Sequence, residues 1–184
     1  MLSKDRLRQV REAVERRDGD RLEVLLAGDA SPTAEFWRLR LACRQALWPE
    51  ALRAARSYLA QTLPEPEVLR GEAVALTKLG DPGAAAAWDR LAALSPDGPE
   101  PWHRGALTRL RAGDEVGALS RALRLVALAD RHQEALGLAA PLLARLGAFE
   151  ALARRVATLP EAGLPAARDA LAALDAAGEA GGAG

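Results

Sequence analysis

Apolar residues recur every three to four positions through most of the 184-residue chain, and Pro or Gly interrupts them at short intervals. This spacing places the apolar side chains on one face of an α-helix. Sustained alternation is absent, and Ala, Leu, Arg and Glu, which favour helices, are abundant. The pattern therefore predicts an all-α chain built of short helices of about 9 to 16 residues.

The predicted helices pair as five antiparallel hairpins followed by one further helix. The hairpins are expected at residues 3–28, 32–62, 66–95, 99–130 and 132–158. Their separate helices are expected at 3–17, 20–28, 32–47, 49–62, 66–79, 83–95, 99–112, 115–130, 132–146 and 148–158. A capping helix at 164–176 brings the total to about 11 helices, in a single domain over 1–177. The Gly-rich tail at 178–184 is expected to be flexible.

Small residues repeat at a nearly constant interval along the chain. Gly80, Gly113 and Gly147 each separate two apolar segments, and their spacing matches the period of about 34 residues of a helical-hairpin repeat. A second set of positions keeps the same spacing: Ala51, Ala84, Ala118 and Leu152. Such periods are typical of stacked helical hairpins, each too small to bury its own apolar face.

The hairpin at 99–130 resembles a tetratricopeptide repeat. An aromatic residue opens its first helix, a small residue follows four places on, Gly-Asp makes the turn and Ala comes early in the second helix. These residues are Trp102, Ala106, Gly113, Asp114 and Ala118. The hairpin at 66–95 is similar, with Leu69, Ala73, Gly80, Asp81, Ala84, Trp88 and Pro96. The hairpin at 132–158 keeps Leu136, Ala140, Gly147, Phe149 and, just beyond it, Pro160.

The resemblance covers about residues 65–160, whereas residues 1–64 share only its rhythm. It implies a right-handed α-solenoid whose first helices line a concave groove, and a scaffold that binds a peptide or partner protein there. Members of that family that clamp the C-terminal tails of heat-shock chaperones use groove asparagines. This chain has no Asn, and the matching places hold Val74, Leu107 and Pro141. That particular function is therefore not expected.

A basic residue stands two places before each expected turn glycine. These residues are Arg17, Lys78, Arg111 and Arg145. If the first helices line a groove, as the resemblance implies, this column meets an acidic peptide or a C-terminal carboxylate. Arg70 and His103, each ten places before a turn glycine, widen the basic patch. The alternative is that the cations only complement the helix macrodipole.

Two stripes of residues on the helix at 32–47 suggest a second candidate surface. One stripe combines tryptophan with arginine: Trp37, Arg40, Leu41, Arg44 and Trp48. The adjacent stripe is apolar: Phe36, Leu39, Cys43, Ala46 and Leu47. Both cannot be fully buried, so the first is either an exposed recognition surface or inter-repeat packing with snorkelling arginines. Trp88, Trp102 and Cys43 are expected to be buried.

Composition and charge narrow the classes of function. The 25 basic and 25 acidic residues give zero formal net charge, so no global field attracts nucleic acid or anionic membrane. No stretch reaches the roughly 18 apolar residues of a spanning helix, and no apolar signal core is expected. The single cysteine fits a reducing compartment, so we expect a cytoplasmic protein. Scarce lysine and absent Asn and Ile indicate a GC-rich bacterial genome, mesophilic or thermophilic.

No residue pattern points to catalysis or to a cofactor. The two histidines, His103 and His132, stand far apart in the sequence and lack Cys or Asp neighbours at metal-ligand spacing. No Gly-rich phosphate loop and no nucleophile–base arrangement stands out. We therefore expect a non-catalytic protein–protein interaction scaffold, without cofactor or metal.

The alternative function is a helical-repeat module of a transcription regulator or nucleic-acid-binding protein. The side chains that line the groove discriminate between a peptide-binding scaffold and a nucleic-acid-binding module. A groove lined wholly by arginine favours phosphate, whereas a mixed apolar and basic groove favours peptide.

Overall fold

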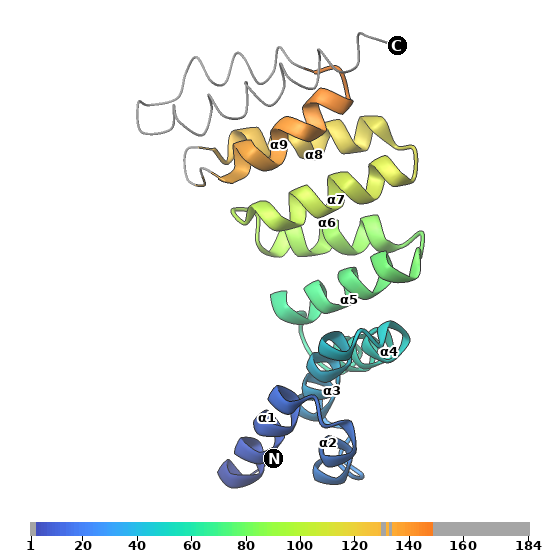
Figure 1. The fold of residues 1–184 in the computed structure, drawn as a ribbon, viewed down its shortest axis with the longest axis vertical. Helices are drawn as coiled ribbons and strands as arrows, with labels where there is room; N and C mark the ends of the chain where they lie inside the picture. The colour runs from blue at the N-terminus through green and yellow to red at the C-terminus, as the bar shows by residue number, and fades with distance from the viewer. Residues whose placement is uncertain (1–2, 130–131, 133, 149–184) are drawn as a thin grey trace. The chain divides into compact units, whose positions relative to one another are not determined.

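The computed structural model describes residues 3–129, 132 and 134–148, and helices are the regular secondary structure of these residues. The helices are α1 (Lys4–Arg16), α2 (Gly19–Leu25), α3 (Pro32–Gln45), α4 (Trp48–Leu59), α5 (Pro66–Leu79), α6 (Ala84–Leu94), α7 (Pro99–Arg111), α8 (Glu115–Ala127) and α9 (Glu134–Arg145) (Figure 1). The all-α prediction is confirmed, and the helix bounds agree with the predicted ones to within a few residues. The helix predicted at 148–158, apart from its first residue Ala148, the helix predicted at 164–176 and the tail at 178–184 lie outside the described residues.

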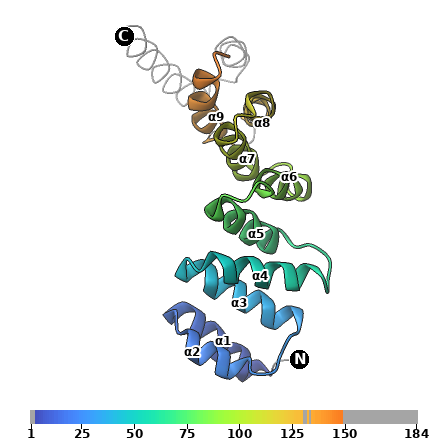
Figure 2. The same ribbon diagram turned by 90° about the vertical axis from the view of Figure 1, so that its right-hand side faces the viewer.

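The chain divides into two compact units, Met1–Ala87 and Trp88–Gly184. In the first unit, α1 pairs with α2, α3 with α4, and α4 also packs on α5. In the second unit, α7 pairs with α8, and α9 packs on both of them. The first helices of successive hairpins lie side by side, α1 with α3 and α3 with α5, and in the second unit α7 with α9 (Figure 2). The prediction of one domain over 1–177 stays a prediction.

Polar caps and prolines explain where the helices begin. A side-chain oxygen accepts a hydrogen bond from the backbone N–H three residues on at four helix starts: Ser3, Asp18, Ser31 and Asp114. Such caps satisfy one of the N–H groups that a helix start leaves unpaired. Proline stands in the first turn of α3, α4, α5 and α7, where its missing N–H costs nothing.

Five first helices end in the same turn. In each case a backbone N–H two or three residues beyond the helix donates to the carbonyl five residues earlier at 2.9 Å: Asp18 to Ala13, Leu47 to Ala42, Asp81 to Leu76, Asp114 to Arg109 and Ala148 to Leu143. This is the Schellman motif, which requires a left-handed residue just before the donor. That residue is Gly80, Gly113 or Gly147 in the later hairpins, as predicted. In the first two hairpins it is Arg17 or Ala46, each with φ 57°.

The first two turns differ from their predicted positions. Gly19, the glycine two places after Arg17 that was expected to make the first turn, is instead the first residue of α2. The second turn lies at Ala46, inside the helix predicted at 32–47 and ahead of Trp48 and Pro49. The left-handed residue Ala46 precedes Gly80 by the same period that separates Gly80, Gly113 and Gly147. The period therefore reaches one hairpin further back than the glycines show.

Exchanging Gly and Ala at two equivalent turns is expected to have opposite effects on stability. Gly80→Ala is expected to lower the free energy of unfolding by about 1 kcal/mol, because a Cβ is strained at positive φ. No atom lies within 4 Å of that Cβ, so the strain is purely local. Ala46→Gly relieves the same strain and is expected to raise stability by up to about 1 kcal/mol. Urea unfolding of both variants checks this, and equal losses at the two positions would refute the shared turn.

Buried alanines set the spacing between helices. Ala51, Ala84 and Ala118, the periodic positions within the described residues, are buried. Ala73 and Ala106 are fully buried, as the resemblance implies for the helix crossings. Trp88, 1% exposed, lies in the core as predicted, whereas Trp102 is half-buried and packs on the edge of the core of the second unit.

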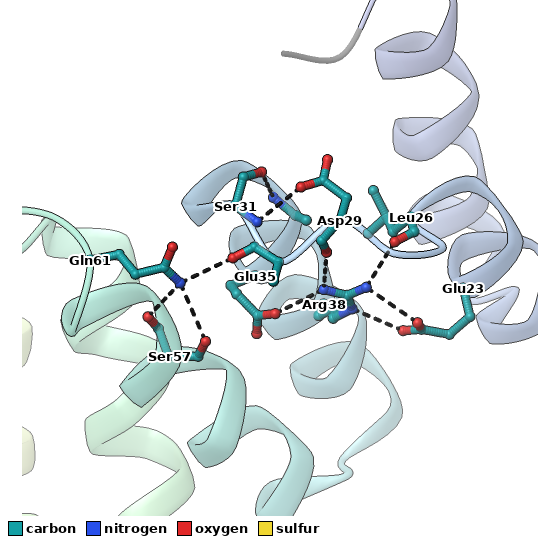
Figure 3. A network of polar contacts seen from close by, with 10 residues as sticks. Glu23, Leu26, Asp29, Ser31, Glu35, Arg38, Ser57 and Gln61 are labelled. Carbon is teal, nitrogen blue, oxygen red and sulfur yellow. Dashed lines mark hydrogen bonds and ion pairs between the residues drawn. The ribbon is translucent and has the colours of Figure 1, made fainter.

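Arg38 joins the first two hairpins (Figure 3). Its guanidinium donates to the carbonyls of Leu26 at 3.0 Å and Asp29 at 2.8 Å, near the end of α2. It also pairs with the carboxylates of Glu35 at 2.8 Å and Glu23 at 3.3 Å. The Arg38 side chain is 15% exposed and that of Glu35 is 6% exposed. The Arg38 side chain therefore supplies hydrogen-bond donors to two backbone carbonyls and also pairs with the buried carboxylate of Glu35.

A second polar cluster ties the helices of the second unit. Asp89 of α6 accepts from Arg109 of α7 at 2.5 Å and from Arg121 of α8 at 2.9 Å. Gly117 lies against Arg109, because a Cβ there would stand 2.7 Å from the Arg109 Cδ and Nε atoms. The absence of a side chain at 117 thus makes room for the arginine between the helices.

The chain's single tyrosine links α4 to α5. The Tyr58 hydroxyl donates to Glu65, the N-cap residue of α5, at 2.5 Å. Burial, and then the hydrogen bond and negative charge of Glu65, raise the pKa of Tyr58 to about 12. The folded state therefore holds this proton more tightly than the unfolded chain, whose tyrosine pKa is about 10. The stability gained from this is complete below pH 10 and is lost as the pH rises toward 12.

Absorbance at 295 nm, titrated on the folded chain, is expected to show Tyr58 still largely protonated at pH 11. The same titration in denaturant is expected to give a midpoint near 10. Glu65→Gln is expected to lower the folded midpoint, because it removes the negative charge beside the phenol. A folded midpoint near 10, with helical circular dichroism intact, would contradict the Tyr58–Glu65 contact.

Candidate functional site

A pocket of about 270 Å³ lies in the first unit, between α3 and α5 and beside the start of α4. Its walls come from first helices of neighbouring hairpins, with one residue from α4. We call this the α3–α5 pocket, and its lining residues are Leu39, Arg40, Cys43, Arg44, Trp48, Glu67, Arg70, Gly71 and Val74.

The α3–α5 pocket combines residues from both candidate surfaces of the sequence analysis. Arg40, Arg44 and Trp48 come from the tryptophan–arginine stripe, and Arg70 comes from the widened basic patch. The Lys78 ammonium lies 6.0 Å from the centre of the Trp48 ring, within the range of a cation–π contact. Five of the ten candidate residues therefore gather around one pocket.

The helix ends explain why Arg44 belongs with the basic column. Arg44 stands two residues before the left-handed Ala46, as Lys78, Arg111 and Arg145 stand before their glycines. Arg17 instead occupies the left-handed position itself. The sequence alone does not show the register of Arg44, because the turn residue of the second hairpin is not glycine.

The tryptophan–arginine stripe divides between packing and exposure. Trp37 is 8% exposed and belongs to the core of the first unit, so it presents no open ring face. Arg40 lies 5.8 Å from the ring centres of both Phe36 and Trp37, and its Nη1 is 2.9 Å from Glu67 Oε1. Trp48 remains half-buried at the pocket wall. Trp37 therefore has a packing role in the core, whereas Trp48 is partly exposed at the pocket.

Cys43 is half-buried in the pocket wall, less buried than the sequence predicted. Burial, and then the negative charge of Glu67, raise the pKa of the Cys43 thiol. The group is therefore a protonated thiol at neutral pH, which is a poor nucleophile and acts as a small apolar side chain.

The other candidate residues belong to the second unit. Arg111 and Arg145 are exposed in the last turns of α7 and α9. His103 is half-buried, and burial, followed by the positive charge of Arg104, lowers its pKa. The imidazole is therefore neutral at pH 7 and adds no positive charge to the basic patch.

Trp102 makes contacts of its own in the second unit. Its indole Nε1 donates to the Pro96 carbonyl at 2.9 Å, and the Arg124 guanidinium lies 5.9 Å from its ring. Both contacts hold the ring in place, although it is less buried than the sequence predicted.

No three or more His, Cys, Asp or Glu side chains gather as a metal site in residues 3–129, 132 and 134–148. Of the helices in this part of the chain, none has the length and apolar character needed to span a bilayer.

The first helices of the hairpins end in the same type of turn, and buried alanines recur at a nearly constant interval along the chain. Together these features define a helical-repeat fold of the tetratricopeptide type. This fold agrees with the crystal structure of YrrB, a tetratricopeptide-repeat (TPR) protein with an unusual peptide-binding site, at a TM-score of 0.60. The sequences are 19% identical, and the match covers 91% of this chain and 84% of YrrB. No protein-family model and no curated protein sequence matches the chain. The predicted tetratricopeptide-type fold is thus confirmed at the level of structure.

Proposed function

We propose that this chain is a non-catalytic interaction scaffold that binds a peptide, or an extended segment of a partner protein, along its first helices. The observation that carries the proposal is the α3–α5 pocket, which is open between two first helices and mixes apolar and basic side chains. Successive first helices form the inner surface of a helical-repeat array, where extended ligands bind. The peptide-binding site of YrrB, which shares the fold, supports the same class of ligand.

The size of the pocket favours side chains of a peptide over a whole small molecule. Its volume of about 270 Å³ is at the lower limit of ligand pockets, which are typically about 300 to 1,000 Å³. A pocket of this size holds one or two side chains, and the remainder of a longer ligand lies outside it. Binding energy then comes from several such contacts along the first helices.

The lining also favours peptide over nucleic acid. Leu39, Cys43 and Val74 make apolar surface, and Glu67 adds a carboxylate that repels phosphate. The positive charge of Arg44, Arg70 and Lys78 instead favours an acidic peptide. Single-stranded nucleic acid is the second candidate ligand, because the Trp48 ring with these basic neighbours could act as a base-stacking platform. We place either activity in the cytoplasm, since a single cysteine is typical of reducing compartments.

Selection from a random peptide library displayed on phage, with the full chain as bait, tests the scaffold proposal. Val74→Glu puts a negative charge on the pocket wall, and Ala86→Glu puts the same charge on an exposed position of α6 as the matched control. Selected peptides are expected to bind the wild type and Ala86→Glu equally and Val74→Glu more weakly. Equal binding to all three proteins would exclude the pocket. If no peptide is selected and the chain binds single-stranded oligonucleotides instead, the result would favour nucleic acid as the ligand.

A further inference from the structure

The α3–α5 pocket has a buried side and an exposed side with different chemistry. The apolar floor consists of Leu39, Cys43 and Val74, which are buried or half-buried. Gly71 closes this floor, because a Cβ there would stand only 2.9 Å from a methyl group of Leu39. The basic rim consists of Arg44, Arg70 and Lys78, which are exposed. A ligand must therefore present an apolar group and a charged group to the same pocket.

The charges of the lining determine the sign of the ligand. Arg40, Arg44 and Arg70 line the pocket together with a single carboxylate, Glu67. That carboxylate contacts Arg40 at 2.9 Å, which shows that a guanidinium at this pocket pairs with a carboxylate side chain. The lining, with Lys78 beside Trp48, thus carries more basic than acidic side chains. This positive balance favours an acidic ligand group.

The backbone geometry of an extended peptide fits this arrangement. Successive side chains of an extended chain point to opposite faces, so residues two places apart lie on the same face. An acidic residue and an apolar residue at positions i and i+2 thus reach the rim and the floor together. Adjacent residues do not, because one of them points away from the pocket.

We propose that the α3–α5 pocket recognises an extended peptide with Asp or Glu at one position and a large aliphatic or aromatic residue two positions away. The acidic side chain pairs with Arg44 and Arg70 at the basic rim. The apolar side chain lies on Leu39, Cys43 and Val74 beside the Trp48 ring. This specificity rests on the proposed scaffold function and gives that function a defined ligand class.

Fluorescence anisotropy with four labelled peptides tests the specificity on the full chain without altering it. Each peptide has a Gly-Ser background, and the first carries Glu at position i and Leu at i+2. The other three replace Glu by Gln, replace Leu by Ser, or move Leu to i+1. Each replacement is expected to weaken binding by about tenfold or more, which corresponds to the loss of one good contact. Equal affinities for all four peptides would overturn the proposal.

A charge swap on the protein tests which residues hold the acidic group. The double variant Arg44→Glu with Arg70→Glu is expected to lose the Glu/Leu peptide and to gain affinity for a Lys/Leu peptide. Arg53→Glu with Arg56→Glu, at exposed positions of α4 outside the pocket, is the matched control and is expected to keep the wild-type preference. A preference for Glu that survives the swap at 44 and 70 would overturn the assignment of the rim.

Cys43 reports directly on the floor, because it is the only cysteine of the chain. Saturating Glu/Leu peptide is expected to slow alkylation of Cys43 by iodoacetamide, whereas the Gln/Leu peptide at the same concentration is not. Unchanged alkylation under saturation would overturn the location of the ligand. If library-selected peptides bind the chain but neither protect Cys43 nor need an acidic residue, the specificity fails while the scaffold function stands. If no peptide binds, both fail.

Discussion

Arg38→Ala is expected to lower the free energy of unfolding by about 3 to 5 kcal/mol, because it leaves the buried carboxylate of Glu35 without its positively charged partner. Without the guanidinium, Glu35 loses its partner at 2.8 Å, and the Leu26 and Asp29 carbonyls lose their donors. Glu35 is buried, and its Oε2 atom already has no hydrogen-bond partner. Thermal and urea unfolding followed by circular dichroism measure the loss.

Two comparison variants identify the cause of the expected loss. Arg56→Ala removes an exposed arginine of α4 and is expected to change stability by less than about 0.5 kcal/mol. The double variant Arg38→Met with Glu35→Leu is expected to recover most of the loss, because apolar residues of similar volume often replace a buried ion pair without cost. If Arg38→Ala unfolds like Arg56→Ala, the network of Figure 3 does not hold the first two hairpins together.

Ala106→Trp is expected to destabilise the second unit by more than about 3 kcal/mol, because a large ring there forces neighbouring side chains from their rotamers and separates the helices. Ala106 is fully buried on α7 and belongs to the same core cluster as Ala122 of α8 and Leu136 of α9. Because repeats share their interfaces, the damage should extend to α9. The melting temperature measures the effect.

The matched control for Ala106→Trp is Ala112→Trp, at the exposed C-cap of α7. It adds the same ring without entering the core and is expected to melt close to wild type. Equal melting temperatures for Ala106→Trp and wild type would show that the small residue is not required at the crossing of these helices.

Local chemistry explains why the helices could be predicted from the sequence. Ser, Asp and Pro at helix starts, and Gly at three helix ends, act through the backbone of their own turn. The turn at Ala46 could not be predicted in this way, because alanine carries no signal for positive φ. There an unfavourable residue adopts the left-handed conformation, with the same turn hydrogen bonds as the later hairpins. The register of Arg44 was therefore not predicted either.

The candidate site depended on packing that one sequence does not reveal. Arg38 looked like any charged residue of an exposed helix face, since all of its partners except Glu35 lie outside its own helix: Glu23 is on α2, and the Leu26 and Asp29 carbonyls follow α2. The sequence named Arg40, Arg44, Trp48 and Arg70 for two different surfaces. They line one pocket because α3 and α5 approach each other at Gly71, a helical glycine with no local role in the pattern.

Amide hydrogen exchange of the full chain, with and without saturating Glu/Leu peptide, tests the central claim most directly. The first helices α3 and α5 are proposed to bind a peptide with an acidic and an apolar side chain between them. Exchange is therefore expected to slow in residues 39–48 and 67–78, which contain the pocket lining, while α2 stays unchanged. Slower exchange confined to other helices, or no change with the peptide demonstrably bound, would contradict the account.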